Sequence, residues 1–174
     1  MTTTLAVRRI GASEGGERID SLTDLLLDCV GGGASISFML PLERDKARGF
    51  WQNVIDGVRR GERTLVVAED DEGRIVGTVQ MITSMPDNQP HRADIAKLLV
   101  HRHARRGGVG QQLMLAIEDE ARKQQRTVLV LDTASPEAER LYERMGWQRV
   151  GVIPNYALMP DGVLCATTYY YKQL

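Results

Sequence analysis

The stretch from Lys97 to Ile117 reads KLLVHRHARRGGVGQQLMLAI, and it decides the fold. Its apolar start, 98–100, is typical of a β-strand, and the spacing of Leu113, Met114 and Ile117 is typical of an amphipathic helix. A basic turn with three glycines joins the two segments. Because the first N–H groups of a helix lack partners and carry the positive end of its dipole, this arrangement predicts an anion-binding cradle.

The residues of the turn favour a phosphate as the anion. Gly107, Gly108 and Gly110 allow a bulky group to approach the backbone, and Arg105 and Arg106 add positive charge. We therefore expect a phosphorylated cofactor at this turn. The glycines lack the G-x-G-x-x-G spacing of a dinucleotide-binding domain, and no Gly-Lys-Ser/Thr follows, as it would in a Walker loop. The sequence therefore argues against both of these phosphate-binding motifs.

Length and composition indicate one globular domain, residues 1–174. The net charge of −1 argues against a basic field for nucleic acid, and no apolar run approaches the roughly 20 residues of a membrane span. Residues 1–10 lack the apolar stretch of a secretory signal. Cys29 and Cys165 are far apart and fit free thiols. We expect a cytoplasmic protein with no nucleic-acid or membrane partner.

Hydrophobic periodicity predicts a mixed α/β fold in the order β-α-α-β-β-β-α-β-α-β-β. The expected strands are 5–10, 64–69, 74–83, 94–100, 128–132, 147–153 and 166–171, and the expected helices are 19–29, 42–58, 108–125 and 136–145.

Several local signals refine these elements. Asp20 or Ser21 can cap the first helix, and Ser135 can cap the last one with Pro136 at its first position. The strand 128–132 is apolar up to its last residue, so we expect it to be buried on both faces.

Two motifs, in this order along the chain, resemble signatures of the GNAT family of N-acetyltransferases. They are Arg105-x-x-Gly108-x-Gly110 and Ala138-x-x-Leu141-Tyr142-x-x-x-Gly146-Trp147. The resemblance implies the GNAT (acyl-CoA N-acyltransferase) fold, a mixed sheet of about seven strands flanked by about four helices. Its fourth and fifth strands splay apart to admit the donor.

A closer resemblance is to the tabtoxin-resistance acetyltransferases. It is carried by Gly32-Gly33-Ala34-Ser35, Phe38-Met39, Leu131-Asp132-Thr133 and Pro160-Asp161-Gly162. It implies acetyl transfer to a small amine or amino-acid-like molecule, such as a toxin or antibiotic.

The family resemblance also implies acetyl-CoA as donor, with no metal. His101 and His103 resemble a metal pair but have no convincing third ligand. The residues implied in donor binding are Leu98, Leu99, Val100, Arg105, Arg106, Gly107, Gly108, Val109, Gly110, Gln111, Ser135 and Tyr142. Many family members have Asn where this chain has Ser135.

Acetyl transfer needs one group that takes a proton from the amine and a second group that donates a proton or a hydrogen bond to the leaving thiolate. Tyr142 is the expected acid. Asp94 and Asp132 are the two candidates for base or water holder, and the choice between them stays open. In the family the acid on the fourth strand is often Glu, so the shorter Asp94 favours a bridging water.

Acceptor contacts are expected from Ser35, Phe38, Asp132 and Tyr156. Two other functions remain open: a protein N-terminal or lysine acetyltransferase, and a non-catalytic acyl-CoA-binding sensor. The paired C-terminal strands are compatible with a homodimer.

Overall fold

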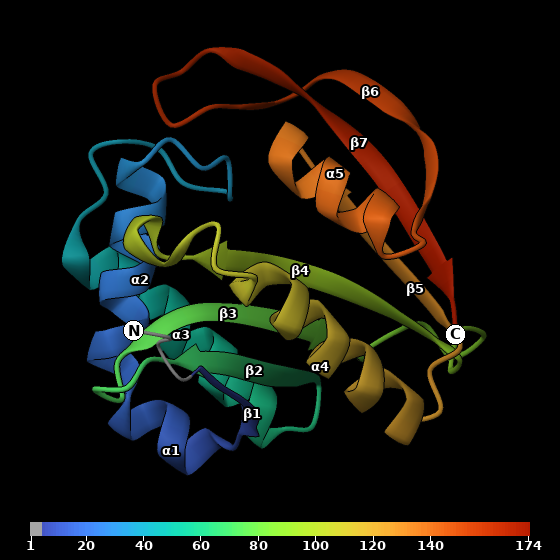
Figure 1. Ribbon diagram of the computed structural model, residues 1–174, viewed down its shortest axis with the longest axis horizontal. Coiled ribbons are helices and arrows are strands. Elements are labelled where there is room, and N and C mark those ends of the chain that lie inside the picture. Colours follow the sequence, from blue (N-terminus) through green and yellow to red (C-terminus); the bar gives the residue numbers. More distant parts are fainter. Residues whose placement is uncertain (1–4) are drawn as a thin grey trace.

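The computed structural model describes residues 5–174, and these form a seven-stranded mixed sheet with helices on both faces (Figure 1). Residues 1–4, which begin the segment examined for a secretory signal, lie outside the described residues. The strands are β1 (Ala6–Ile10), β2 (Arg63–Glu69), β3 (Ile75–Ile82), β4 (Arg92–Val100), β5 (Val128–Thr133), β6 (Gln148–Leu158) and β7 (Leu164–Gln173). The helices are α1 (Ala12–Glu17), α2 (Ile19–Gly31), α3 (Arg44–Arg59), α4 (Val109–Lys123) and α5 (Pro136–Arg144), with a 3-10 turn at Arg102–Ala104.

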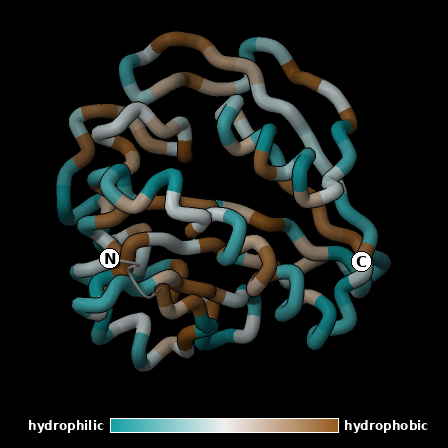
Figure 2. Tube along the Cα trace, in the orientation of Figure 1, coloured by the Kyte–Doolittle hydropathy of each residue, from teal (hydrophilic) through white to brown (hydrophobic). Residues whose placement is uncertain are grey.

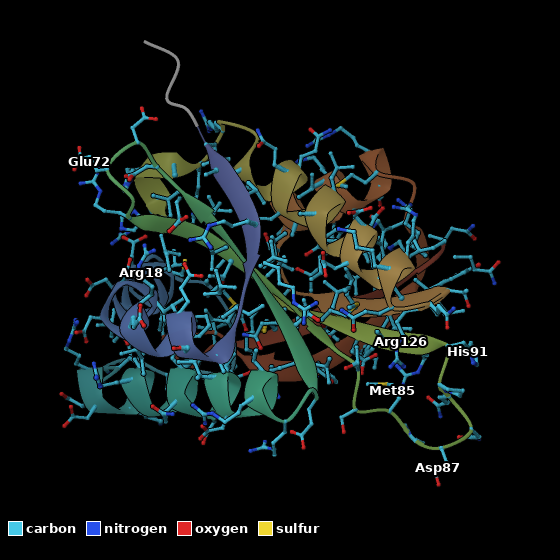
Figure 3. The ribbon with its side chains drawn as sticks, turned by 90° about the horizontal axis from the view of Figure 1, so that it is seen from below. Arg18, Glu72, Met85, Asp87, His91 and Arg126 are labelled. Carbon is cyan, nitrogen blue, oxygen red and sulfur yellow. The ribbon has the colours of Figure 1, made fainter. Side chains whose placement is uncertain are left out.

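The strand order is β1-β2-β3-β4-β5-β7-β6, and β4–β5 is the parallel pair among otherwise antiparallel neighbours. This topology confirms the fold expected from the sequence. The helices α4 and α5 cover one face, whereas α1, α2 and α3 cover the other (Figures 1 and 3). The loop that carries Met85 and Asp87 extends beyond the end of the sheet (Figure 3). Among residues 5–174, no helix is both long and apolar enough to span a membrane.

Each face of the sheet has its own hydrophobic cluster, and the strands are correspondingly apolar (Figure 2). Beneath α4 and α5 the fully buried members include Val79, Met81, Leu113, Met114, Ile117, Leu129 and Tyr170. Beneath α1–α3 they include Leu22, Leu25, Leu26, Trp51 and Val67. Gly77 on β3 allows α4 to sit directly on the sheet, because a Cβ there would lie 2.9 Å from Leu113 Cδ1. This contact fixes the start of α4.

The first helical segment differs from the sequence expectation. The short helix α1 was not predicted, because its sequence, ASEGGE, carries no apolar stripe. The helix α2 begins at Ile19, so Asp20 and Ser21 lie inside it and the predicted cap is wrong. Instead, the Ser21 hydroxyl accepts a hydrogen bond from the backbone N–H of Ile75 at 3.1 Å.

The second half of the chain agrees more closely with the elements expected from the sequence. The Ser135 hydroxyl accepts from the backbone N–H of Ala138 at 3.2 Å with Pro136 at the first helical position, which confirms the predicted cap. The expected burial of β5 on both faces is wrong: Leu129 and Leu131 are buried, but Val128 and Val130 are only partly so. The reason is that α2 and α3 pack mainly on β2, β3 and β4 rather than on β5.

A buried charged network joins α4 to the C-terminal strands. Glu118 on α4 is 2% exposed, and its carboxylate accepts from Trp147 Nε1 at 3.0 Å and from Lys172 Nζ at 2.8 Å. Lys172 Nζ also donates to the carbonyl of Met145 at 2.7 Å. The network connects one half of the sheet to the other, because α4 packs on β2, β3 and β4 whereas Lys172 lies on β7.

Replacing Glu118 with Leu should therefore destabilise the fold. The substitution leaves the Lys172 ammonium, whose side chain is 19% exposed, without its carboxylate. Removing one partner of a buried pair costs about 3–5 kcal/mol, and the partial exposure of Lys172 places the expected loss at the lower end of that range. Urea unfolding followed by circular dichroism measures the free energy of unfolding. The matched control is Asp119→Leu, one residue along α4, where the carboxylate pairs with Lys123 on the exposed surface. Equal losses in the two variants would show that the network contributes no more than a surface pair.

Candidate active site

The strands β4 and β5 separate partway along their length, as Figure 1 shows. Their parallel ladder joins Arg92–Asp94 to Val128–Val130 and then ends. β4 continues to Val100 with β3 as its only hydrogen-bonded neighbour among the described strands. At the bulge in this stretch Lys97 has a φ of 54°. A cleft of about 1180 Å³ opens here, and residues 95–100 form one of its walls.

The start of α4 lies at this cleft, and its first backbone N–H groups have no partner within the helix. Gly108 is the residue before the helix, its φ is 77°, and no side chain caps the helix. Residues 108–111 line the cleft. A Cβ on Gly110 would lie 3.2 Å from Leu141 Cδ2, so a glycine lets α4 approach α5 closely. The orphan N–H groups and the positive φ are the local geometry that an anion cradle requires.

Arginines surround the outer end of the cleft. Arg105 Nε donates to the carbonyl oxygen of Val100 at 3.2 Å. A second hollow of about 500 Å³ adjoins the loop, lined by Arg102, Arg105, Arg106, Glu137, Arg140 and Arg144. Arg102 is paired with Asp28 at 2.9 Å, which leaves four guanidinium groups beside the one carboxylate of the lining. This end of the cleft therefore has a positive potential suited to a ligand with several phosphates.

Tyr142 lies on the face of α5 that packs on the sheet, and only 5% of it is exposed. Its ring packs against Trp147 and Tyr170, with a centroid distance of 5.9 Å to each. Burial, and secondarily the charge of Asp132, raise the pKa of the Tyr142 phenol well above its usual value. Tyr142 also lines the cleft, and its hydroxyl makes no hydrogen bond to another residue within 5–174. The phenol is thus a protonated donor at neutral pH.

The two candidate carboxylates differ in position. Asp132 lies one residue before the end of the ladder between β5 and β7, lines the cleft, and accepts a hydrogen bond from Thr167 Oγ1 at 2.7 Å. Asp94 lies where β4 is still paired with β5; it forms an ion pair with Arg92 and is not among the residues that line the cleft. The structure therefore brings Asp132, but not Asp94, to the cleft.

The other end of the cleft is formed by the loop 32–39 and by β6 and β7. Ser35 Oγ donates to the carbonyl of Leu158 at 3.3 Å and lies 3.6 Å from Cys165 Sγ. Phe38 packs edge-to-face on Phe50, with centroids 5.3 Å apart. The hydroxyl of Tyr156 is 3.1 Å from that of Tyr169. The Ser35 contacts hold the loop against the C-terminal hairpin, whereas Phe38 packs the loop on α3 and the tyrosine pair joins the two strands of the hairpin.

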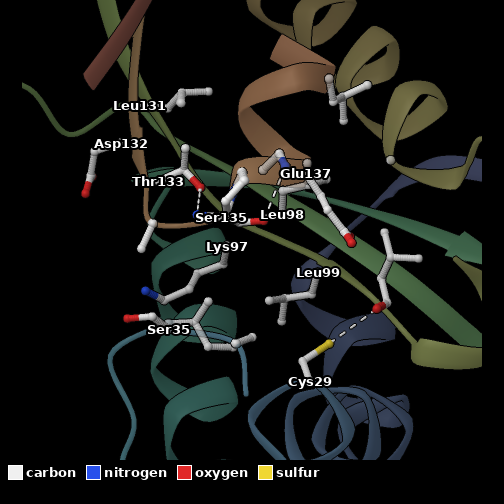
Figure 4. A pocket seen from close by; sticks show the side chains of 18 of the residues that line it. Cys29, Ser35, Lys97, Leu98, Leu99, Leu131, Asp132, Thr133, Ser135 and Glu137 are labelled. Carbon is white, nitrogen blue, oxygen red and sulfur yellow. Dashed lines mark hydrogen bonds between the residues drawn. The ribbon is translucent and has the colours of Figure 1, made fainter. Parts of the chain in front are cut away.

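Most of the sequence-predicted site residues come together around this cleft. Those that line it are Leu98, Leu99, Val100, Arg105, Arg106, Gly108, Val109, Gly110, Gln111, Asp132, Ser135, Tyr142, Ser35, Phe38 and Tyr156. Besides Asp94, the residue left outside is Gly107, which is exposed and is not among the lining residues. Figure 4 shows residues of β4, β5 and the start of α5 meeting across the cleft.

Three kinds of lining residue were missed by the sequence analysis. Lys97 was included in an uninterrupted strand, and only a bulge places its side chain in the cleft. Thr167, which holds Asp132, has no local signal. Arg140 and Arg144 have the sequence appearance of solvated helix residues, although their spacing of four places them on one face of α5 beside the glycine loop.

Comparisons with known proteins agree with this geometry. A sequence model of the Acetyltransferase (GNAT) domain family matches residues 61–149. An uncharacterized N-acetyltransferase from the hisH-hisA intergenic region of Azospirillum brasilense is 32% identical over 132 residues, which cover 75% of this chain and 76% of that protein.

Solved structures share the fold over nearly the whole chain. A candidate acetyltransferase from Acinetobacter baylyi superposes with a TM-score of 0.82 at 14% identity, covering 99% of this chain and 93% of that one. The yncA protein of Salmonella typhimurium, solved with acetyl-CoA, superposes with a TM-score of 0.78 at 17% identity, covering 98% and 94%. The family match, the relative in Azospirillum brasilense and the split sheet agree: this chain belongs to the GNAT family and is an acetyltransferase.

Proposed function

We propose that this chain transfers an acetyl group from acetyl-CoA to the amine of a small molecule, with donor and acceptor bound together. The observation that carries the proposal is that one cleft joins three features: an uncapped helix start with arginines, an unpaired stretch of β4 backbone, and the pair Tyr142 and Asp132. Each feature suits a different part of the same reaction.

The donor end of the cleft fits a CoA thioester. The N–H groups at 108–111 and the surrounding arginines suit phosphates, and the backbone of 98–100 can pair with the amides of the pantetheine arm as a further strand would. When bound, acetyl-CoA supplies an activated acetyl group. Backbone and arginine charge already supply positive potential, so the proposal needs no metal.

Acetyl transfer forms a C–N bond and breaks a C–S bond, so one proton leaves the amine and the sulfur leaves as a thiolate. Asp132 is the candidate to hold the ammonium or the water that takes its proton, because its carboxylate faces the cleft and is oriented by Thr167. Tyr142 is the candidate donor to the sulfur, since its raised pKa keeps the phenol protonated. A backbone N–H of β4 can stabilise the carbonyl oxygen as charge develops on it.

The acceptor class in this proposal is a small amine, including toxin or antibiotic molecules as in the tabtoxin-resistance enzymes. The segments that carry this closer resemblance lie together in the fold: 32–39 and 131–133 line the cleft, and Leu40 N donates to the Pro160 carbonyl at 3.0 Å. The resemblance therefore concerns the acceptor end of the cleft rather than scattered surface positions.

Thiol release with acetyl-CoA and a panel of β-lactam amino acids, aminoglycosides, polyamines and peptides tests the proposed activity. The variant Gly108→Glu should abolish it, because the new carboxylate repels the phosphates and weakens acetyl-CoA binding by about 100-fold or more in calorimetry. The matched control is Gly73→Glu, at a distant turn with a φ of 73° against 77° at Gly108. Tight binding without turnover on any amine would favour the sensor function, and turnover on peptides alone would favour a protein acetyltransferase.

Tyr142→Phe should lower kcat by about 100- to 10,000-fold while acetyl-CoA affinity stays close to that of the parent protein. Because the pKa of Tyr142 is raised, its loss of a proton should not reduce kcat until the pH is well above 10, the ordinary value for tyrosine. A pH–rate profile of the parent protein measures this. An unchanged kcat in the variant would remove Tyr142 from the reaction.

Asp132→Asn should lower kcat/KM by about 100-fold, whereas Asp94→Asn should have a much smaller effect. The reason is position: the cleft is lined by Asp132, while Asp94 is held by Arg92 in the paired part of the sheet. Steady-state kinetics of the two variants at neutral pH makes the comparison. A larger loss for Asp94→Asn would assign the proton-handling role to Asp94 instead.

A further inference from the structure

Lys97 brings a positive charge to the acceptor end of the cleft. It sits at the bulge of β4 with a φ of 54°, and its side chain lines the cleft. Figure 4 shows its ammonium pointing to the same side of the cleft as the Asp132 carboxylate and Ser35, whereas Cys29 and Glu137 lie on the other side. The phosphate cradle has arginines of its own, so Lys97 is not needed there.

The Lys97 ammonium has few partners. It has three donor hydrogens, and the hydrogen bond that it makes goes to Ser37 Oγ at 3.0 Å. No carboxylate within residues 5–174 lies within 4.0 Å of it. Burial in the cleft lowers the pKa of Lys97, and the nearby charge of Asp132 opposes that effect. A partly buried charge without a counter-ion is costly, so an anionic ligand would be stabilising.

The structure behind Lys97 is also rich in donors. Arg63 on β2 lies close enough to lower the pKa of Lys97, and its guanidinium donates to Gln80 Oε1 at 2.8 Å. Arg63 Nε and Gln80 Nε2 are buried and have no acceptor within the described chain. Lys97 in the cleft, with Arg63 and two unpaired N–H donors behind it, therefore gives this side of the cleft a positive potential.

Asp132 supplies the opposite charge across the same space. The Asp132 carboxylate accepts a hydrogen bond from Thr167 and not from Lys97. Its negative charge nevertheless acts on Lys97, because it raises the pKa of the ammonium. Two opposite charges that face one space without pairing are complementary to a molecule that carries one charge of each sign. The ammonium of such a molecule suits Asp132, and its anion suits Lys97.

We infer that the acceptor carries a carboxylate as well as the amine that is acetylated, and that Lys97 binds this carboxylate. The inference rests on the proposed acetyl transfer and narrows its acceptor to amino acids or similar zwitterions. Lys97 is then a specificity-determining residue, because a neutral amine would leave its charge unpaired. Discrimination of this kind is strong where a buried polar group loses its partner.

Matched acid and amide acceptors test the inference by thiol release: glycine and glycinamide, β-alanine and β-alaninamide, and γ-aminobutyrate and its amide. For each pair the measured quantity is the ratio of kcat/KM for the acid to that for the amide. Lys97→Met should lower this ratio by about 10- to 100-fold, because a charged hydrogen bond to the carboxylate is lost. The amines of the acid and of the amide differ in basicity. Because the wild-type protein and the variant are assayed with the same pair, this difference cancels when their two ratios are compared.

Lys97→Arg should retain most of the ratio because it keeps the charge. Lys46→Met, at an exposed position on α3 outside the cleft, makes the same change in net charge and should leave the ratio unchanged. The wild-type protein gives an independent readout if Lys97→Met fails to fold: butyrate, which keeps the carboxylate of γ-aminobutyrate and lacks its amine, should compete with the acceptor but not with acetyl-CoA, and butyramide should not compete.

Two results would overturn the inference while leaving acetyl transfer intact. One is an equal loss of activity on acids and amides in Lys97→Met, which would place Lys97 in donor binding or in folding. The other is a wild-type protein that prefers amides and is not inhibited by butyrate. Failure to acetylate any amine, charged or neutral, would instead contradict the proposed function itself, and the inference with it.

Discussion

The parallel ladder between β4 and β5 ends after Asp94 and Val130, and the active-site cleft exists because it ends there. A sheet that stayed paired would use the backbone groups of 98–100 in its own ladder. The bulge at Lys97 turns β4 before those residues, so their free edge faces a space of about 1180 Å³. Backbone N–H and C=O groups need partners, and a ligand with amide groups can supply them.

The separation of the two strands is stable because each half of the sheet has its own support. β1–β4 are covered by α1–α3 on one face and α4 on the other, and α5 covers the second half. At the closed end of the cleft the halves are tied by backbone bonds, from Thr127 N to the His91 carbonyl and from Leu174 N to the Thr127 carbonyl. The Glu118 carboxylate adds a link from α4 to β7 through Lys172. The strands are thus fixed at one end and open at the other.

Sequence reasoning succeeded where a feature depends on neighbours along the chain. The glycine turn before α4, the Ser135 cap and the order of the strands along the chain all follow from local spacing. It failed where the outcome depends on a distant partner. Whether a strand residue faces the cleft depends on the bulge, and the bulge is invisible in the run Asp94 to Val100. Asp94 was therefore expected in the cleft and Lys97 was not.

The exposed residues of α5 also have a role that depends on distant partners and cannot be predicted from local sequence. Arg140 and Arg144 follow the pattern of a solvated face, and only the folded position of α5 beside the glycine loop makes them part of a basic hollow. The extra helix α1 also depends on a tertiary contact, since Gly15 is buried and a Cβ there would lie 3.1 Å from Ile55 Cγ1. Composition alone does not predict a helix with two glycines.

The environment of Tyr142 also limits what it can do for the leaving sulfur. A thiol has an ordinary pKa near 8.5 and a phenol near 10, so complete proton transfer from phenol to thiolate is uphill by about 2 kcal/mol even in water. Burial raises the pKa of Tyr142 further, which makes complete transfer still less favourable. A protonated phenol in a dry site nevertheless makes a strong hydrogen bond to an anion. Tyr142 therefore suits the stabilisation of a departing thiolate by a hydrogen bond, with solvent supplying the proton after the C–S bond has broken.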